Sequence, residues 1–120
     1  MCKNLRIYVT LIASLFLIAC EDRPKRVQCD MHLVVAKKAF ETHHYQKVVA
    51  EIEKAKVLRC SQDSISLYRY GLSLKQLGKP LKAKSVIEEA VKDRDLEPGL
   101  YENALLALSE LDAIEGNQKP

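Results

Sequence analysis

The sequence repeats itself at a constant spacing between residues 29–60 and 64–95. Ala36 aligns with Gly71, and Ala55 aligns with Ala90, so matched positions lie 35 residues apart in each case. A unit of this length forms one supersecondary element that cannot bury its apolar side alone. The chain is therefore expected to fold as a stack of similar units.

Each unit divides into two stretches in which apolar residues recur every three or four positions, as on one side of a helix. The second unit breaks between Gly78 and Pro80, where a glycine ends one helix and a proline begins the next. The first unit breaks at residues 42–44. A third periodic segment runs from Pro98 to Ile114 and is expected to stop at Gly116. The pattern predicts an all-α fold of about five antiparallel helices.

Small residues recur at the positions where the helices must touch. They are Ala36 and Ala55 in the first unit, and Gly71, Ala83 and Ala90 in the second. This pattern resembles the tetratricopeptide repeat, a helix-turn-helix unit of about 34 residues. The resemblance implies two helical hairpins followed by a C-terminal capping helix.

The chain departs from that family at three positions. Val48 replaces the usual alanine, Pro80 replaces the aromatic residue near the turn, and Leu105 stands where the third segment should carry a small residue. A terminal helix that receives no further repeat explains the departure at Leu105. The alternative fold is an unrelated bundle of five helices.

The N-terminus has the charge and apolar pattern of an export signal, because Lys3 and Arg6 precede an apolar run over 7–19. A run of about 13 residues spans roughly 20 Å, less than the roughly 30 Å hydrocarbon core of a membrane. The run ends in Leu17-Ile18-Ala19-Cys20, which resembles the bacterial lipobox. That resemblance implies a signal peptide over 1–19 and a lipidated Cys20. The alternatives are a signal anchor and a secreted protein with an incidental Cys20.

The expected organisation continues with a lipidated cysteine and tether over 20–28, a helical domain over 29–116 and a disordered tail over 117–120. The tether is charged and contains Pro24. In lipobox proteins an aspartate directly after the cysteine favours the inner membrane, and Glu21 is only a near match. The expected location is therefore the periplasmic side of the bacterial envelope, with the outer membrane favoured over the inner.

Two of the four cysteines remain in the domain after Cys2 leaves with the signal and Cys20 takes the lipid. Cys29 starts the first helix and Cys60 ends the second, and these two ends lie side by side in a hairpin. Because export leads to an oxidising compartment, we predict a disulfide between them. The alternative is a zinc site with His32 as a third ligand, but the sequence offers no evident fourth ligand. No metal is predicted.

Composition and motifs argue against nucleic-acid binding and catalysis. The chain has 19 Lys and Arg against 16 Asp and Glu, and loss of Lys3 and Arg6 leaves 17 against 16. A near-neutral domain lacks the basic surface that nucleic acids require. The sequence contains no glycine-rich phosphate loop, no Gly-x-Ser-x-Gly and no His-Glu-x-x-His. We therefore predict no catalytic residues and no cofactor.

In a stack of hairpins the first helix of each unit lines a concave groove. The resemblance to the tetratricopeptide family places the groove residues at Leu33, Lys37, Phe40, Glu41, Tyr68, Leu72, Lys75, Glu102, Leu106 and Ser109. An exposed apolar strip of this kind marks a site for an amphipathic helix or an extended peptide. In the alternative, Phe40, Tyr68 and Leu72 pack against neighbouring helices and no groove forms.

The resemblances together imply a lipid-anchored periplasmic adaptor whose partner is another envelope protein. Such an adaptor would assemble or stabilise a secretion system, a pilus or outer-membrane machinery, as a pilotin or accessory subunit. Two alternatives remain open, a peptidoglycan-associated cell-wall module and a structural homo-oligomer. The sequence does not predict the oligomeric state.

Overall fold

The computed structural model of the protein describes residues 24–92 and 96–118, and within these ranges it is helical and contains no strand. This confirms the predicted all-α fold. The helices are α3 (Lys25–Glu41), α4 (Tyr45–Val57), α5 (Ser64–Gln76), α6 (Pro80–Lys92) and α7 (Pro98–Gln118). None of these helices is long and apolar enough to cross a membrane. The predicted signal peptide and Cys20 lie outside the described residues.

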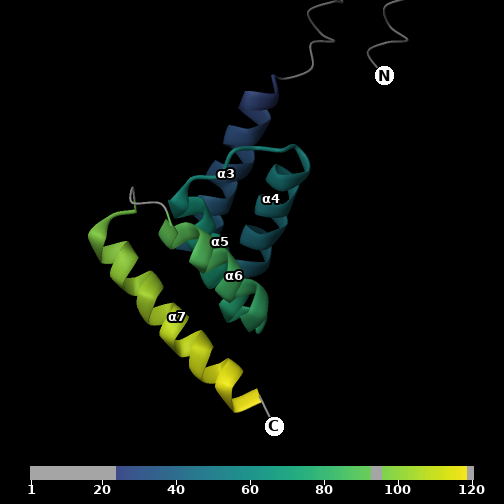
Figure 1. Ribbon diagram of the computed structural model, residues 1–120. Helices are drawn as coiled ribbons and strands as arrows, with labels where there is room; N and C mark the ends of the chain where they lie inside the picture. The colour runs from purple at the N-terminus through teal and green to yellow at the C-terminus, as the bar shows by residue number, and fades with distance from the viewer. Residues whose placement is uncertain (1–23, 93–95, 119–120) are drawn as a thin grey trace, which may run out of the picture.

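The helices form two antiparallel hairpins, α3 with α4 and α5 with α6, and the long helix α7 lies alongside the second hairpin (Figure 1). Helix α5 is central, because it contacts each of the other four. Within the described ranges the backbones of α4 and α6 do not pack against each other, although an ion pair between Lys82 and Glu53 joins them at the surface, whereas α5 packs between α3 and α7. The first helices of the units thus form one row.

Two helix boundaries differ from those expected. Helix α3 begins at Lys25, directly after Pro24, rather than at residue 29. Proline is tolerated before the first turn, and Lys, Arg and Gln are good helix formers, so residues 25–28 of the expected tether belong to the helix. Helix α7 passes through Gly116 and ends at Gln118. A glycine in an exposed helix costs only about 1 kcal/mol, so it does not force the helix to stop.

Three helices end in the same way, with one residue in the left-handed region of backbone conformation. These residues are His43 (φ 60°), Arg59 (φ 58°) and Gly78 (φ 74°). In each case the next N–H donates to a carbonyl five residues earlier, as in the Schellman motif; the bonds are His44 to Ala39, Cys60 to Ala55 and Lys79 to Leu74. The sequence indicated only the glycine.

The core is built where small residues meet large ones, as the repeat predicted. Ala55, Ala83 and Ala90 are fully buried, and so are Ile52 and Ile87. Gly71 is buried as well, and a Cβ atom added to it would overlap the Cγ1 atom of Ile87. The backbone of α5 therefore approaches α6 more closely than any larger residue would permit.

In α7 the small residue at the helix contact is not where the repeat alignment placed it. Ala104 is fully buried, whereas Leu105 has an exposed fraction of 44%. The alignment had set Leu105 at the small position. The correction means that Leu105 faces solvent and does not crowd a neighbouring helix.

We expect Gly71→Ala to lower the free energy of unfolding by about 1 to 3 kcal/mol, because the added methyl overpacks the contact with Ile87. Urea unfolding followed by circular dichroism measures the change. Gly99→Ala is the matched control, since a Cβ at Gly99 meets no atom within 4 Å. An equal effect of both substitutions would show that the contact between α5 and α6 is not the cause.

Candidate interaction surface

The predicted groove residues lie on the row formed by α3, α5 and α7, but they differ in exposure. On α3, Leu33 and Phe40 are half-buried. The exposed members are Lys37, Glu41, Glu102, Leu106 and Ser109. The members on α5 are the least accessible: Tyr68 is buried, and Leu72 and Lys75 are half-buried. The predicted strip is therefore open on its two outer helices and largely closed in the middle.

Helix α7 closes the middle of the strip. The Tyr68 hydroxyl forms a hydrogen bond with Asn103, and burial raises the pKa of Tyr68 by more than this bond lowers it. The Lys75 ammonium forms an ion pair with Glu110. Tyr68 and Lys75 therefore bind α7 and are not free to contact a partner. For Tyr68, packing against a neighbouring helix was the stated alternative to an open groove.

A second set of ion pairs fixes α7 from the side of α6. The Lys84 Nζ atom lies 2.9 Å from Asp112 Oδ1 and 2.7 Å from Glu115 Oε2. Hydrogen bonds with the two carboxylates raise the pKa of Lys84 above its ordinary value. Sequence reasoning missed these pairs, because nothing in the sequence shows which turn of α7 faces α6.

Helix α7 presents exposed apolar side chains beside the predicted groove. Leu106 has an exposed fraction of 60%, and Leu105 and Tyr101 are also exposed. Tyr101 and Leu105 lie four positions apart and therefore share one side of the helix. Leu106 belongs to the predicted groove set, whereas Tyr101 and Leu105 do not. We call Tyr101, Leu105 and Leu106 the α7 surface.

The charges along α7 are all of one sign. Between Pro98 and Gln118 the helix contains Glu102, Glu110, Asp112 and Glu115 and no Lys or Arg. Within the described residues α7 also differs from α3 and α5 in having no second helix to complete a hairpin. The α7 surface thus combines apolar and acidic groups on a helix that has one uncovered side.

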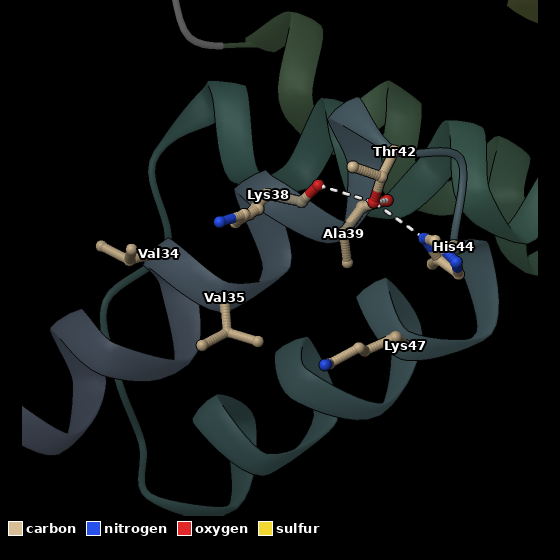
Figure 2. A pocket seen from close by; sticks show the side chains of 7 residues that line it. All are labelled: Val34, Val35, Lys38, Ala39, Thr42, His44 and Lys47. Carbon is tan, nitrogen blue, oxygen red and sulfur yellow. Dashed lines mark hydrogen bonds between the residues drawn. The ribbon is translucent and has the colours of Figure 1, made fainter.

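A hollow of about 460 Å³ lies at the other end of the row, where α3 meets the start of α4 (Figure 2). Its apolar floor comes from Val34, Val35 and Ala39, and Lys38 and Lys47 line it as well. Thr42 and His44 complete the lining. The Thr42 hydroxyl bonds to the Lys38 carbonyl at 3.0 Å and to His44 Nδ1 at 2.8 Å. None of its lining residues belongs to the predicted groove set.

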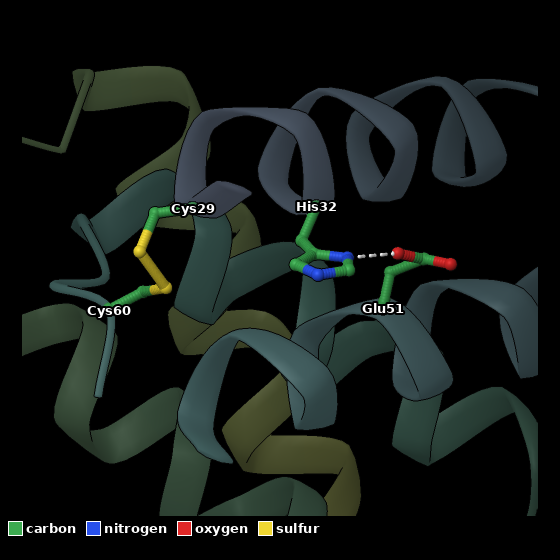
Figure 3. Close-up of a disulfide and its surroundings, with 4 residues drawn as sticks. All are labelled: Cys29, His32, Glu51 and Cys60. Carbon is green, nitrogen blue, oxygen red and sulfur yellow. Dashed lines mark hydrogen bonds and ion pairs between the residues drawn. A yellow bond between two sulfur atoms is a disulfide. The ribbon is translucent and has the colours of Figure 1, made fainter. Parts of the chain in front are cut away.

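The predicted disulfide is present and joins the open end of the first hairpin (Figure 3). Cys29 lies in α3 and Cys60 follows α4, with their Cα atoms 5.6 Å apart. Because the two sulfurs bond to each other, they are not thiolate ligands of the kind that the alternative zinc site required. The described residues contain no group of three His, Cys, Asp or Glu side chains that could hold a metal ion.

His32 has a different partner from the one considered in the zinc alternative. Its Nδ1 atom lies 2.6 Å from Glu51 Oε2 on α4 (Figure 3). Burial by itself raises the pKa of Glu51, but hydrogen bonds from His32 and Lys54 outweigh it and hold this pKa below the ordinary value. The pair links α3 to α4 one turn away from the disulfide.

Comparison with known proteins gives no relative. No protein-family model, no curated protein and no solved structure matches this chain.

Replacing Cys29 and Cys60 together by Ser is expected to lower the free energy of unfolding by about 3 to 4 kcal/mol, because the disulfide restricts the unfolded chain. Urea titrations of the wild type with and without a reducing agent should give a similar difference. The serine variant is the control, because the reducing agent should not change its stability. If the reducing agent leaves the wild type unchanged, the cross-link does not stabilise the domain.

Glu51→Gln is expected to lower the free energy of unfolding by about 1 kcal/mol near neutral pH, because the ionised carboxylate accepts the bond from His32. A lowered pKa stabilises the fold above the unfolded value of 4.5, and this contribution disappears as pH falls through the folded pKa. The difference between wild type and variant should therefore vanish in acid. It is measured by urea unfolding across a pH series.

The control for this prediction is Glu53→Gln on the same helix. Glu53 pairs with Lys82 at the surface, where an ion pair contributes only about 0 to 1 kcal/mol. A deficit in Glu51→Gln that stayed constant down to acidic pH would contradict the assignment to the charged pair.

Proposed function

We propose that this chain is a lipid-anchored adaptor on the periplasmic side of a bacterial envelope, where it binds another envelope protein. The observation that carries the adaptor role is the α7 surface, where Tyr101, Leu105 and Leu106 stand exposed on one helix. Clustered exposed apolar side chains in a small domain mark a protein-interaction site.

Four observations support the compartment and the class of repeat. The lipobox-like end of the signal segment supports export and lipid attachment at Cys20, and a disulfide within the first hairpin fits an oxidising compartment. The contacts of α5 with both α3 and α7 fit a tetratricopeptide-like stack. The close contact at Gly71 fits it too.

The chemistry of the α7 surface defines the partner that it would accept. A helix with an apolar stripe can pack on Tyr101 and Leu105 in the place that a hairpin partner would occupy. Because α7 carries only acidic charges, Lys or Arg beside that stripe would complement Glu102. The proposed partner is therefore a basic amphipathic helix of a secretion, pilus or outer-membrane assembly.

The test is photo-crosslinking in intact cells from a photoreactive residue at position 106. The expected result is one dominant adduct with a single envelope protein. Asp in place of Leu106 should weaken that complex about tenfold or more, because a buried leucine contributes roughly 1.5 to 3 kcal/mol. Adducts are identified by mass spectrometry.

The matched control carries the same photoreactive residue at position 57. Val57 is 83% exposed and lies on α4, away from α7. Equal capture from both positions, or no adduct from position 106, would overturn the proposal. An adduct with a second copy of this chain would instead favour a structural homo-oligomer.

A further inference from the structure

Helix α3 has a second apolar side that the core does not use. Val27, Met31 and Val34 are exposed by 42%, 46% and 65% respectively. Their spacing of four and three residues places them along one side of the helix. Ala36 and Ala39 are buried on the opposite side. The outward side of a helix in a soluble domain is normally polar, so this α3 stripe, Val27, Met31 and Val34, requires an explanation.

Cations outnumber carboxylates around the α3 stripe. Two carboxylates flank it on the same helix, Asp30 and Glu41. The cations are Arg26, Lys37 and Lys38 on α3 and Lys47 at the start of α4. His44 is the titratable group that faces the same hollow. Figure 2 shows the side chains of Val34 and Lys38 extending to the same side of α3.

The stripe lies close to the proposed site of lipid attachment. Helix α3 starts at Lys25, only five residues after Cys20. Five residues span at most about 18 Å in any conformation, so acyl chains on Cys20 would hold the first turn of α3 near the bilayer. This attachment gives the stripe a high effective concentration at the lipid surface. Even a weak affinity of the stripe for lipid is then enough to keep it bound.

We propose that the α3 stripe lies on the phospholipid surface, with Val27, Met31 and Val34 in the interface and the surrounding lysines and arginine at the phosphates. The proposal rests on the lipid anchor of the proposed function. A second copy is the less suitable occupant, because pairing two α3 stripes would bring their excess positive charges together. In this orientation the first hairpin rests on the membrane.

The test places an environment-sensitive fluorophore on position 34 through Val34→Cys in the full chain expressed in a bacterium. Once the signal is removed, Cys20 is lipidated and Cys29 is bonded to Cys60, the new cysteine is the only free thiol. The purified protein is reconstituted in vesicles of phosphatidylethanolamine and phosphatidylglycerol. The emission should shift to shorter wavelength and be quenched by a nitroxide lipid. The same label at Val57→Cys should do neither.

Mass spectrometry of the mature N-terminus separates the two proposals. Lipidated protein with a position 34 label that emits as in water overturns this inference and leaves the anchor intact. Protein without lipid, whose position 34 label also stays in water, overturns both. Equal quenching at positions 34 and 57 contradicts a specific α3 contact, and a blue shift without vesicles shows that the stripe binds a second copy instead.

Discussion

The arrangement of this domain depends on how closely α5 and α6 approach at Gly71. A side chain there would overlap Ile87, so the glycine sets the distance between the two helices of the second hairpin. Because α5 also contacts α3, α4 and α7, its position determines where the neighbouring helices can pack. Close packing of this kind tolerates little change in volume. The contact between Gly71 and Ile87 thus helps to position the surfaces on α3 and α7, although it lies in neither helix.

Periodicity was sufficient to predict five helices, their order and the pairing of Cys29 with Cys60, because each depends on local spacing and on hairpin geometry. It was insufficient to predict which side of α7 packs against the rest of the domain. Leucine and alanine fill every position over 104–108, so apolar side chains point to all sides of the helix there and the pattern does not select one. In the structure, Lys75 and Lys84 pair with acidic residues of α7 on the side that packs. Such contacts depend on the tertiary structure, which a repeat alignment does not describe.

The candidate interaction surface was likewise predicted only in part. The family pattern identified Leu106, which is exposed, but it also identified Tyr68 and Lys75, which α7 covers. An array with further repeats would leave such positions facing a groove. Here the last helix, α7, has no hairpin partner among the described residues, and exposed apolar side chains lie on α7 itself. The α3 stripe was missed because Val27 lay in the expected tether, which left only Met31 and Val34 on that side of the predicted helix.

The disulfide has a mechanical consequence. Any tension applied between the N-terminal attachment and α7 passes from Cys29 through the sulfur bridge to Cys60, and then along the connection to α5. The 30–59 segment, with both helices of the first hairpin, lies outside this load path. A force that pulls on the N-terminal end of α3 therefore cannot separate α3 from α4 beyond Cys29. In the proposed adaptor, the bonded hairpin would act as a fixed joint between the lipid anchor and the partner bound to α7.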